Sequence, residues 1–222
     1  MSEKGTLYVV GTPIGNLSDT TQRARDILSR VDLILCEDTR VTAKLLARLE
    51  IQNSTESLHQ HTDEKKFIKI SDRLKSGENI ALVSDAGTPN ISDPGGKFVE
   101  FLVGQHVDII PIPGASALTA ALSVCGFPAD KFTFLGFPPH KKGRNGYFDH
   151  LTRIEHTIVL YESKHRIIKT LEQLPQDRKL MVGREITKMH ETLYRGTASE
   201  IIELLEKSST KGEFVIVLAP SK

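Results

Sequence analysis

Four short apolar runs in the first half of the chain each end in a polar or glycine-rich turn, and this recurrence constrains the fold most. Between the runs, apolar residues recur at helical spacing, as in Thr20–Val31 and Lys65–Leu74. The order strand, turn, helix predicts an α/β domain with a mostly parallel sheet and right-handed crossovers. The predicted strands are Leu7–Val10, Leu33–Cys36, Ile80–Val83 and Val107–Ile112.

The turns after these strands are expected to converge, because the carboxyl ends of neighbouring parallel strands lie on one edge of a sheet. Glycine and proline bends let the backbone approach a ligand closely. They therefore favour a neutral or zwitterionic ligand held by main-chain groups, such as a nucleoside with an amino-acid tail. Ser84–Gly95 alone is more typical of a structural crossover loop than of a binding loop, so the convergence carries the prediction. The turns read GTPIGN (11–16), EDTR (37–40), SDAGTP (84–89) and PIPGASA (111–117).

The same turns exclude several common sites. GTPIGN lacks the third glycine of GxGxxG, and Pro13 removes a backbone donor, which argues against a Rossmann dinucleotide site. No P-loop or GxSxG motif is present. His59 and His61 have no carboxylate or cysteine at ligand spacing, so no metal site is expected. Cys36 and Cys125 lie far apart among apolar neighbours, so no disulfide is expected.

The second half predicts a mixed α/β domain. Short connections between its last strands suggest antiparallel pairing. We expect a boundary near Pro113, which gives domains 1–113 and 114–222. The predicted strands are Phe132–Leu135, Thr157–Tyr161, Lys179–Gly183, Glu191–Gly196 and Glu213–Leu218, and helices are expected over Ser116–Val124, up to Leu151, from Glu162–Arg166 through Leu174, and over Ala198–Lys207.

Charge and hydropathy limit the class of protein. The formal net charge of +1 excludes a globally basic nucleic-acid coat but permits a local basic patch. The amino-terminal MSEKGTLYVVG is too short in apolar length for a signal peptide. No apolar run approaches the roughly 18 residues that span a bilayer. These features predict a soluble cytoplasmic protein.

Eight motifs together carry a family resemblance that covers essentially the whole chain. They closely resemble, in the expected order, the 16S ribosomal RNA 2′-O-ribose methyltransferases of the tetrapyrrole-methylase superfamily. The motifs are GTPIGNL (11–17), EDTR (37–40), SDAGTPNISDPG (84–95), PIPGASA (111–117), GFPP (136–139), YESKHR (161–166), REITKMHE (184–191) and KGE (211–213).

The resemblance implies a two-domain α/β fold, with a mostly parallel amino-terminal sheet and a mixed carboxyl-terminal sheet. It implies S-adenosylmethionine in the cleft between the domains, a homodimer, and no metal. The implied reaction is 2′-O-methylation of a cytidine in the decoding region of 16S ribosomal RNA, within the 30S subunit. The implied cofactor contacts are Pro13, Ile14, Ser84, Asp85, Ala86, Gly87, Ile91, Ser116, Ala117 and Tyr161, with the region around Arg184 and Gly212 closing the site.

Methylation of a ribose hydroxyl requires a group that takes up its proton. The candidates are Asp38, Glu162, Glu185 and Lys188; Asp85 is also considered, although a cofactor contact is preferred for it. For Glu185 and Lys188 the alternative is a salt-bridged strand end. Cations at the predicted turns are expected to meet RNA phosphates, although each alone is equally typical of a solvated surface. They are Arg40, Lys142, Arg144, Arg166 and Arg184, together with Lys188.

Two other functions remain open at this stage. One is methylation of a small tetrapyrrole, which the polar EDTR turn and the basic KKGR run (141–144) fit poorly. The other is a ribosome assembly factor that keeps the fold without activity, against which the intact SDAGTP motif argues.

Overall fold

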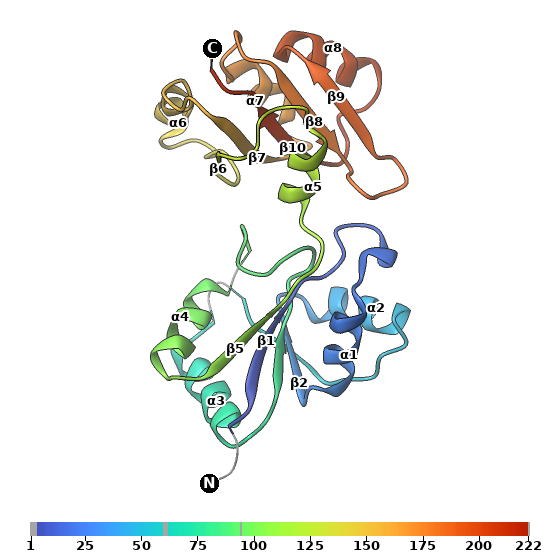
Figure 1. Cartoon of the computed structure of the whole chain (residues 1–222), viewed down its shortest axis with the longest axis vertical. Coiled ribbons are helices and arrows are strands. Elements are labelled where there is room, and N and C mark those ends of the chain that lie inside the picture. Colours follow the sequence, from blue (N-terminus) through green and yellow to red (C-terminus); the bar gives the residue numbers. More distant parts are fainter. Residues whose placement is uncertain (1–3, 60–61, 94, 222) are drawn as a thin grey trace. The chain divides into compact units, whose positions relative to one another are not determined.

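The computed structural model describes residues 4–59, 62–93 and 95–221. The chain forms two compact units that divide between Ser116 and Ala117 (Figure 1). The predicted boundary near Pro113 lies just before this division.

The amino-terminal unit contains a five-stranded sheet in the order β3-β2-β4-β1-β5, with every pair parallel. Each crossover passes through helical structure, as the strand–turn–helix order predicts. The strands are β1 (Thr6–Val10), β2 (Leu33–Cys36), β3 (Thr55–Ser57), β4 (Ile80–Leu82) and β5 (Asp108–Ile112). The helices are α1 (Gln22–Arg30), α2 (Thr39–Arg48), α3 (Glu64–Lys75) and α4 (Gly96–Gly104), with a short 3₁₀ turn at Leu17–Asp19.

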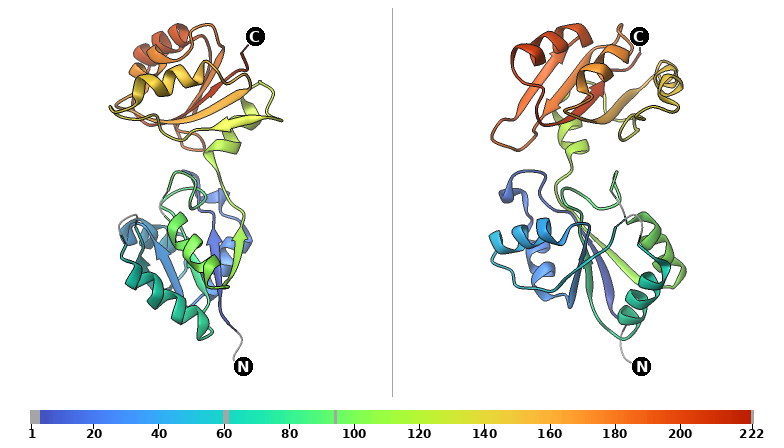
Figure 2. Two further views of the ribbon diagram at one scale, coloured as in Figure 1. Left: turned by 90° about the vertical axis from the view of Figure 1, so that its left-hand side faces the viewer. Right: turned by 180° about the vertical axis from the view of Figure 1, so that it is seen from behind.

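Helices cover both faces of this sheet (Figure 2). Leu33 and Leu35 of β2 pack with residues of α3 and α4, whereas Ile34 and Cys36 pack with residues of α1 and α2. Successive strand residues point to opposite faces, so a strand buried on both faces needs a continuous apolar run. Cys36 is accordingly a fully buried core residue.

The carboxyl-terminal unit contains a second five-stranded sheet, in the order β6-β7-β10-β8-β9. β6 and β7 pair in parallel, whereas β10 pairs antiparallel with β7 and β8, and β8 with β9. The predicted mixed sheet is therefore confirmed. Its strands are β6 (Phe132–Phe134), β7 (Thr157–Ser163), β8 (Leu180–Arg184), β9 (Thr192–Gly196) and β10 (Glu213–Leu218), and its helices are α5 (Ala117–Val124), α6 (Arg144–Leu151), α7 (Ile167–Gln173) and α8 (Ala198–Lys207).

The two faces of this sheet bury different helices. Leu160 and Ile216 belong to a cluster with residues of α6, α7 and α8, whereas Val159 and Val217 pack with residues of α5. Among the helices that the structure describes, none has the length and apolar character needed to cross a bilayer.

The structure differs from the sequence-based prediction in two places that bear on function. β3 was not predicted, because Thr55–Ser57 is short and polar; it forms by pairing with β2. β7 extends through Ser163, so Glu162 lies in the strand opposite Phe214 and does not open the following helix.

Candidate functional site

The predicted ligand-binding turns of the amino-terminal unit lie at one edge of its sheet. β1, β2, β4 and β5 run parallel, so the turns that follow them share the carboxyl edge (Figure 1). The sequence-based expectation of convergence is met by this topology.

Hydrogen bonds fix the first turn, GTPIGN (11–16), to the loop Ser84–Gly95, which we call the central loop. The Thr12 N–H donates to Gly87 O at 2.8 Å, and the Gly87 N–H donates to Thr12 O at 3.1 Å. The buried Thr12 hydroxyl lies 3.2 Å from both Ser84 O and Gly87 O. The Ser84 hydroxyl lies 3.3 Å from both Ala86 O and Gly87 O. Because its own groups are satisfied in this way, the loop holds its shape before any ligand arrives.

Glycine is required where these turns approach one another. Gly87 has φ +83°, and a Cβ there would lie 3.4 Å from Ile14 Cγ2 and 3.8 Å from Ala115 O. A Cβ on Gly11 would lie 2.8 Å from Gly114 Cα, so the ends of β1 and β5 come too close for a side chain. The Thr88 hydroxyl donates to Ala115 O at 3.4 Å. The structure thus brings three of the predicted cofactor-binding turns together.

The residues predicted to bind the cofactor belong partly to the amino-terminal unit and partly to the carboxyl-terminal unit. Pro13, Ile14 and Ser116 are partly buried at the edge described above, while Asp85, Ala86 and Ile91 are exposed there. Ala117 and Tyr161 belong to the carboxyl-terminal unit. There the Tyr161 hydroxyl accepts a hydrogen bond from the Leu118 N–H at 3.1 Å, and its ring lies 4.9 Å from that of Phe134.

Asp38 is held in a local structural role. Its carboxylate caps α2 by accepting from the Arg40 N–H at 2.8 Å, and it also receives the Arg40 guanidinium at 3.0 Å and 2.6 Å. The Arg40 guanidinium and N–H lower the pKa of Asp38 to about 2. A general base works best with a pKa near the working pH, so this environment argues against the predicted role of Asp38 as proton acceptor. Its own N–H donates to Asp85 Oδ1 at 3.2 Å.

A second group of side chains at this edge was not predicted as a site. A pocket of about 530 Å³ is lined by Glu37, Leu58, His59, Phe67 and Asp93, among others. Burial, reinforced by the charge of Glu37, raises the pKa of Asp93 to about 6, although a hydrogen bond with Ser84 opposes the shift. Glu37 stands within EDTR and Asp93 within SDPG, but the motifs alone did not show that these two side chains line one pocket.

The raised pKa of Asp93 gives a testable dependence of stability on pH. Because this pKa lies above its unfolded value, the protonated form favours folding, and that contribution is lost as the pH rises through about 6. We expect Asp93→Asn to raise the urea midpoint of the protein at about pH 7.5, and this advantage to shrink toward about pH 4. Asp108→Asn, on an exposed residue of β5, is the control. An equal effect of Asp93→Asn at both pH values would contradict the explanation.

Two predicted functional residues of the carboxyl-terminal unit, Glu162 and Arg144, are buried structural groups. Glu162 accepts from the Thr170 hydroxyl at 2.6 Å and pairs with Arg166 at 2.9 Å. Arg144 is only 5% exposed and donates to Gln173 Oε1 at 2.7 Å and to Thr170 Oγ1 at 2.8 Å. The predicted catalytic role of Glu162 and the predicted RNA contact of Arg144 therefore do not agree with their burial.

Arg166 belongs to the same buried network. Its side chain is 14% exposed, and it donates to Pro138 O at 2.7 Å in addition to its pairing with Glu162. An RNA phosphate would have to compete with both partners. The predicted RNA contact of Arg166 therefore does not agree with its burial either.

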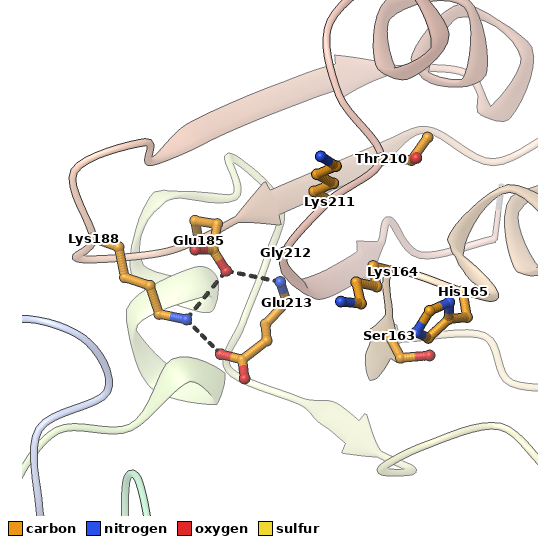
Figure 3. A pocket seen from close by; sticks show the side chains of 9 residues that line it. All are labelled: Ser163, Lys164, His165, Glu185, Lys188, Thr210, Lys211, Gly212 and Glu213. Carbon is orange, nitrogen blue, oxygen red and sulfur yellow. Dashed lines mark hydrogen bonds and ion pairs between the residues drawn. The ribbon is translucent and has the colours of Figure 1, made fainter.

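Glu185 and Lys188 line an open pocket of about 600 Å³ (Figure 3). Lys188 Nζ lies 3.1 Å from Glu185 Oε1 and 2.7 Å from Glu213 Oε2, and the Glu213 N–H donates to Glu185 Oε1 at 2.8 Å. Burial alone would raise the pKa of Glu185, but these donors hold it below its usual value. Burial likewise opposes the charge of Lys188, but Glu213 and Glu185 raise its pKa. Lys188 stays protonated at neutral pH and is unsuited to accept a proton.

The rim of this pocket carries cations. Lys164 and Lys211 are exposed and line the pocket with His165. Lys164 replaces a proline that is usual in the related family, and the sequence also suggests that it faces RNA, whereas His165 and Lys211 were not predicted as a site. Arg184 lies beside it and donates from Nε to Lys211 O at 2.6 Å. Of the predicted RNA-facing residues, Arg40 and Lys142 are exposed. Among the described residues, no group of three or more His, Cys, Asp or Glu side chains is arranged to hold a metal ion; His61 lies outside them.

Sequence comparison gives close matches over nearly the whole chain, and two of them illustrate the range. A Synechocystis protein named ribosomal RNA small subunit methyltransferase I is 46% identical over 220 residues, which are 97% of this chain and 79% of that protein. The protein of the same name from Thermotoga maritima is 43% identical, covering 97% of this chain and 98% of the relative.

Solved structures show the same fold at lower identity. A cobalt precorrin-4 methyltransferase of cobalamin biosynthesis matches with a TM-score of 0.69 and 18% identity, over 96% of this chain and 94% of that one. A Thermus thermophilus uroporphyrin-III C-methyltransferase, solved with S-adenosyl homocysteine, matches with a TM-score of 0.65 and 18% identity, over 97% of each chain. The family model of the tetrapyrrole (corrin/porphyrin) methylases matches residues 6–202. The chain therefore belongs to the tetrapyrrole (corrin/porphyrin) methylase family.

Proposed function

We propose that the protein is an S-adenosylmethionine-dependent methyltransferase that methylates the ribose 2′-hydroxyl of a cytidine in 16S ribosomal RNA. The observation that carries this proposal is the 43–46% identity, over 97% of the chain, to relatives named ribosomal RNA small subunit methyltransferase I. The 30S subunit is the proposed substrate particle, the cytoplasm the proposed location, and a homodimer the proposed form.

The converging turns suit the proposed cofactor. Pro13, Ile14 and Ser84–Gly87 present bent backbone at the edge of the sheet, and Gly87 leaves open the space that a Cβ would fill beside Ile14. Close backbone approach of this kind fits a ligand that combines a nucleoside with an amino acid. Ile91, Ser116, Ala117 and Tyr161 remain proposed contacts.

The bound cofactor supplies a methyl group on a positively charged sulfur. Methyl transfer would form a bond between the ribose 2′-oxygen and the methyl carbon and break the carbon–sulfur bond, with its electron pair going to sulfur and the hydroxyl proton going to a carboxylate of the protein or to water. The main task of the protein is alignment, which contributes up to roughly 7–11 kcal/mol in ideal intramolecular cases, whereas a general base adds about 10²–10⁴-fold.

Glu185 is the remaining proposed proton acceptor among the four predicted residues. Its place in an open pocket supports this proposal. Despite its burial, the Glu213 N–H and Lys188 lower its pKa, as Arg40 lowers that of Asp38, so any base catalysis by Glu185 is weak and alignment remains the main contribution. Arg40, Lys142 and Arg184 are the proposed contacts to RNA phosphates, which strengthen binding without reading the base sequence.

A methyl-transfer assay tests the function. We expect label from radioactive S-adenosylmethionine to enter 30S subunits that lack the modification, at a single cytidine that becomes resistant to alkaline cleavage. Alkaline cleavage of RNA requires a free 2′-hydroxyl, whose ionised oxygen attacks the adjacent phosphate. Resistance to cleavage therefore distinguishes methylation of the ribose from methylation of the base. Uroporphyrinogen III is the control acceptor. Label on the tetrapyrrole with none on the subunits, or no transfer despite measurable cofactor binding, would contradict the proposal.

A further inference from the structure

The 530 Å³ pocket of the amino-terminal unit is lined in part by Ser92, Asp93 and Gly95 of the central loop, whereas none of the proposed cofactor contacts lines it. Its volume falls within the roughly 300–1,000 Å³ typical of small-molecule sites. Ser84, at the start of this loop, is near enough to Asp93 to oppose the rise of its pKa. A group bound there would therefore sit next to the loop that holds the methyl donor.

One wall of the pocket is apolar and aromatic. Leu58 and Phe98 line the pocket, and both side chains are buried. Phe67 is partly exposed and is braced by Phe98, with ring centroids 5.1 Å apart. A partly exposed aromatic ring beside apolar side chains is the kind of surface on which nucleic-acid-binding proteins stack an unpaired base.

The lining also carries two carboxyl groups, Glu37 and Asp93. Neither forms an ion pair with another described residue, unlike the carboxylates of Asp38 or Glu56. Burial raises the pKa of both, that of Asp93 to about 6. With a pKa of about 6, Asp93 is mostly ionised at neutral pH, and a bound group that accepts a hydrogen bond would favour its protonated, donating form while the Glu37 carboxylate accepts.

An acceptor beside a donor matches the pairing edge of cytosine. Its N4 amino group donates and its N3 accepts, whereas uracil presents the opposite pattern at O4 and N3–H. We propose that the pocket receives the extruded base of the target cytidine, with Glu37 accepting from N4 and Asp93 donating to N3. Lys97, exposed at the rim, is placed to meet a phosphate of the same strand. The inference rests on the proposed function and adds the recognition of the base.

A pocket of this kind can receive the target base after it has been turned out of its stack. An enzyme that must reach an atom of a stacked nucleotide turns that nucleotide out into a pocket and reads its exposed edge there. A base seated in this pocket would place its ribose near the central loop, because Ser92 and Asp93 of that loop line the pocket.

Exchange of the target base tests the assignment. Methyl transfer is measured on 30S subunits reconstituted with either cytidine or uridine at the mapped position. We expect the wild-type protein to favour cytidine. Glu37→Gln and Asp93→Asn each place an amide where it can pair with either base, so each is expected to lower the cytidine-to-uridine ratio of kcat/KM by about tenfold or more. Glu100→Gln, on an exposed residue of α4 that does not line the pocket, is the matched control.

Affinity for S-adenosylhomocysteine, measured by calorimetry on the same variants, separates the outcomes. A reduced base ratio with unchanged cofactor affinity supports the base pocket. An unchanged ratio in both variants, or a parallel loss of cofactor affinity, overturns it. If the wild-type protein transfers no methyl group to the cytidine subunits, the proposed function fails, which is a distinct result from failure of the base pocket alone.

Discussion

Replacing Gly87 by leucine is expected to lower the affinity for S-adenosylhomocysteine by roughly 100-fold or more. Gly87 has φ +83°, a conformation that costs a residue with a side chain about 1–3 kcal/mol. A leucine side chain would also enter the space beside Ile14 in which the proposed cofactor meets the backbone. The backbone strain is present with and without the cofactor and lowers stability, so the loss of affinity comes from steric exclusion. Each 1.4 kcal/mol corresponds to about tenfold in affinity, so a 100-fold loss corresponds to about 2.8 kcal/mol. Isothermal titration calorimetry measures it directly.

Gly126→Leu provides a matched control for backbone strain. Gly126 has φ +81°, and a Cβ there would meet nothing within 4 Å. It lies in the other unit, after α5. If both variants lose cofactor affinity equally, the loss arises from general destabilisation, and Gly87 is not at the cofactor.

Replacing Glu162 by alanine is expected to destabilise the carboxyl-terminal unit by about 3–5 kcal/mol, because it strips a buried cation of its partner. The Glu162 side chain is fully buried and lies against Arg166 at 2.9 Å and Thr170 at 2.6 Å. Thr170 also accepts from Arg144, so the loss extends to a second buried guanidinium. Urea unfolding followed by circular dichroism measures the change.

Glu203→Ala is the control for this experiment. Glu203 is 70% exposed and pairs with Lys207 on the surface of α8, and such pairs contribute at most about 1 kcal/mol. If Glu162→Ala leaves the midpoint unchanged and abolishes only methyl transfer, the structural role is wrong and the catalytic prediction for Glu162 regains its support.

Sequence reasoning captured most of the fold because strand burial leaves a clear pattern. LILC at 33–36 is apolar throughout since β2 is buried on both faces. The same reasoning missed β3, whose three residues Thr55–Ser57 are only partly buried and carry no apolar signal. Pairing with β2 determines that strand, and a partner distant along the chain cannot be read from a three-residue segment.

The candidate site was predicted at the level of turns but not of individual side chains. The glycine and polar residues of GTPIGN and SDAGTP indicated where backbone would gather. Whether a cation faces solvent depends on tertiary packing, which is why Arg144 was predicted to face RNA although it is buried against Phe148. The proximity of Glu37 to Asp93 depends on β2 and the central loop meeting across the sheet edge, which motif spacing does not encode.

The position of β10 has a consequence for how the chain is made. β10 lies between β7 and β8, although it is synthesised after both of them (Figure 1). The amino-terminal sheet, in contrast, is complete once β5 has emerged from the ribosome. Domains generally fold as units during synthesis, the amino-terminal one first. The edges of β7 and β8 that pair with β10 therefore stay open until β10 has been synthesised. During translation the second unit is thus more exposed to aggregation than the first.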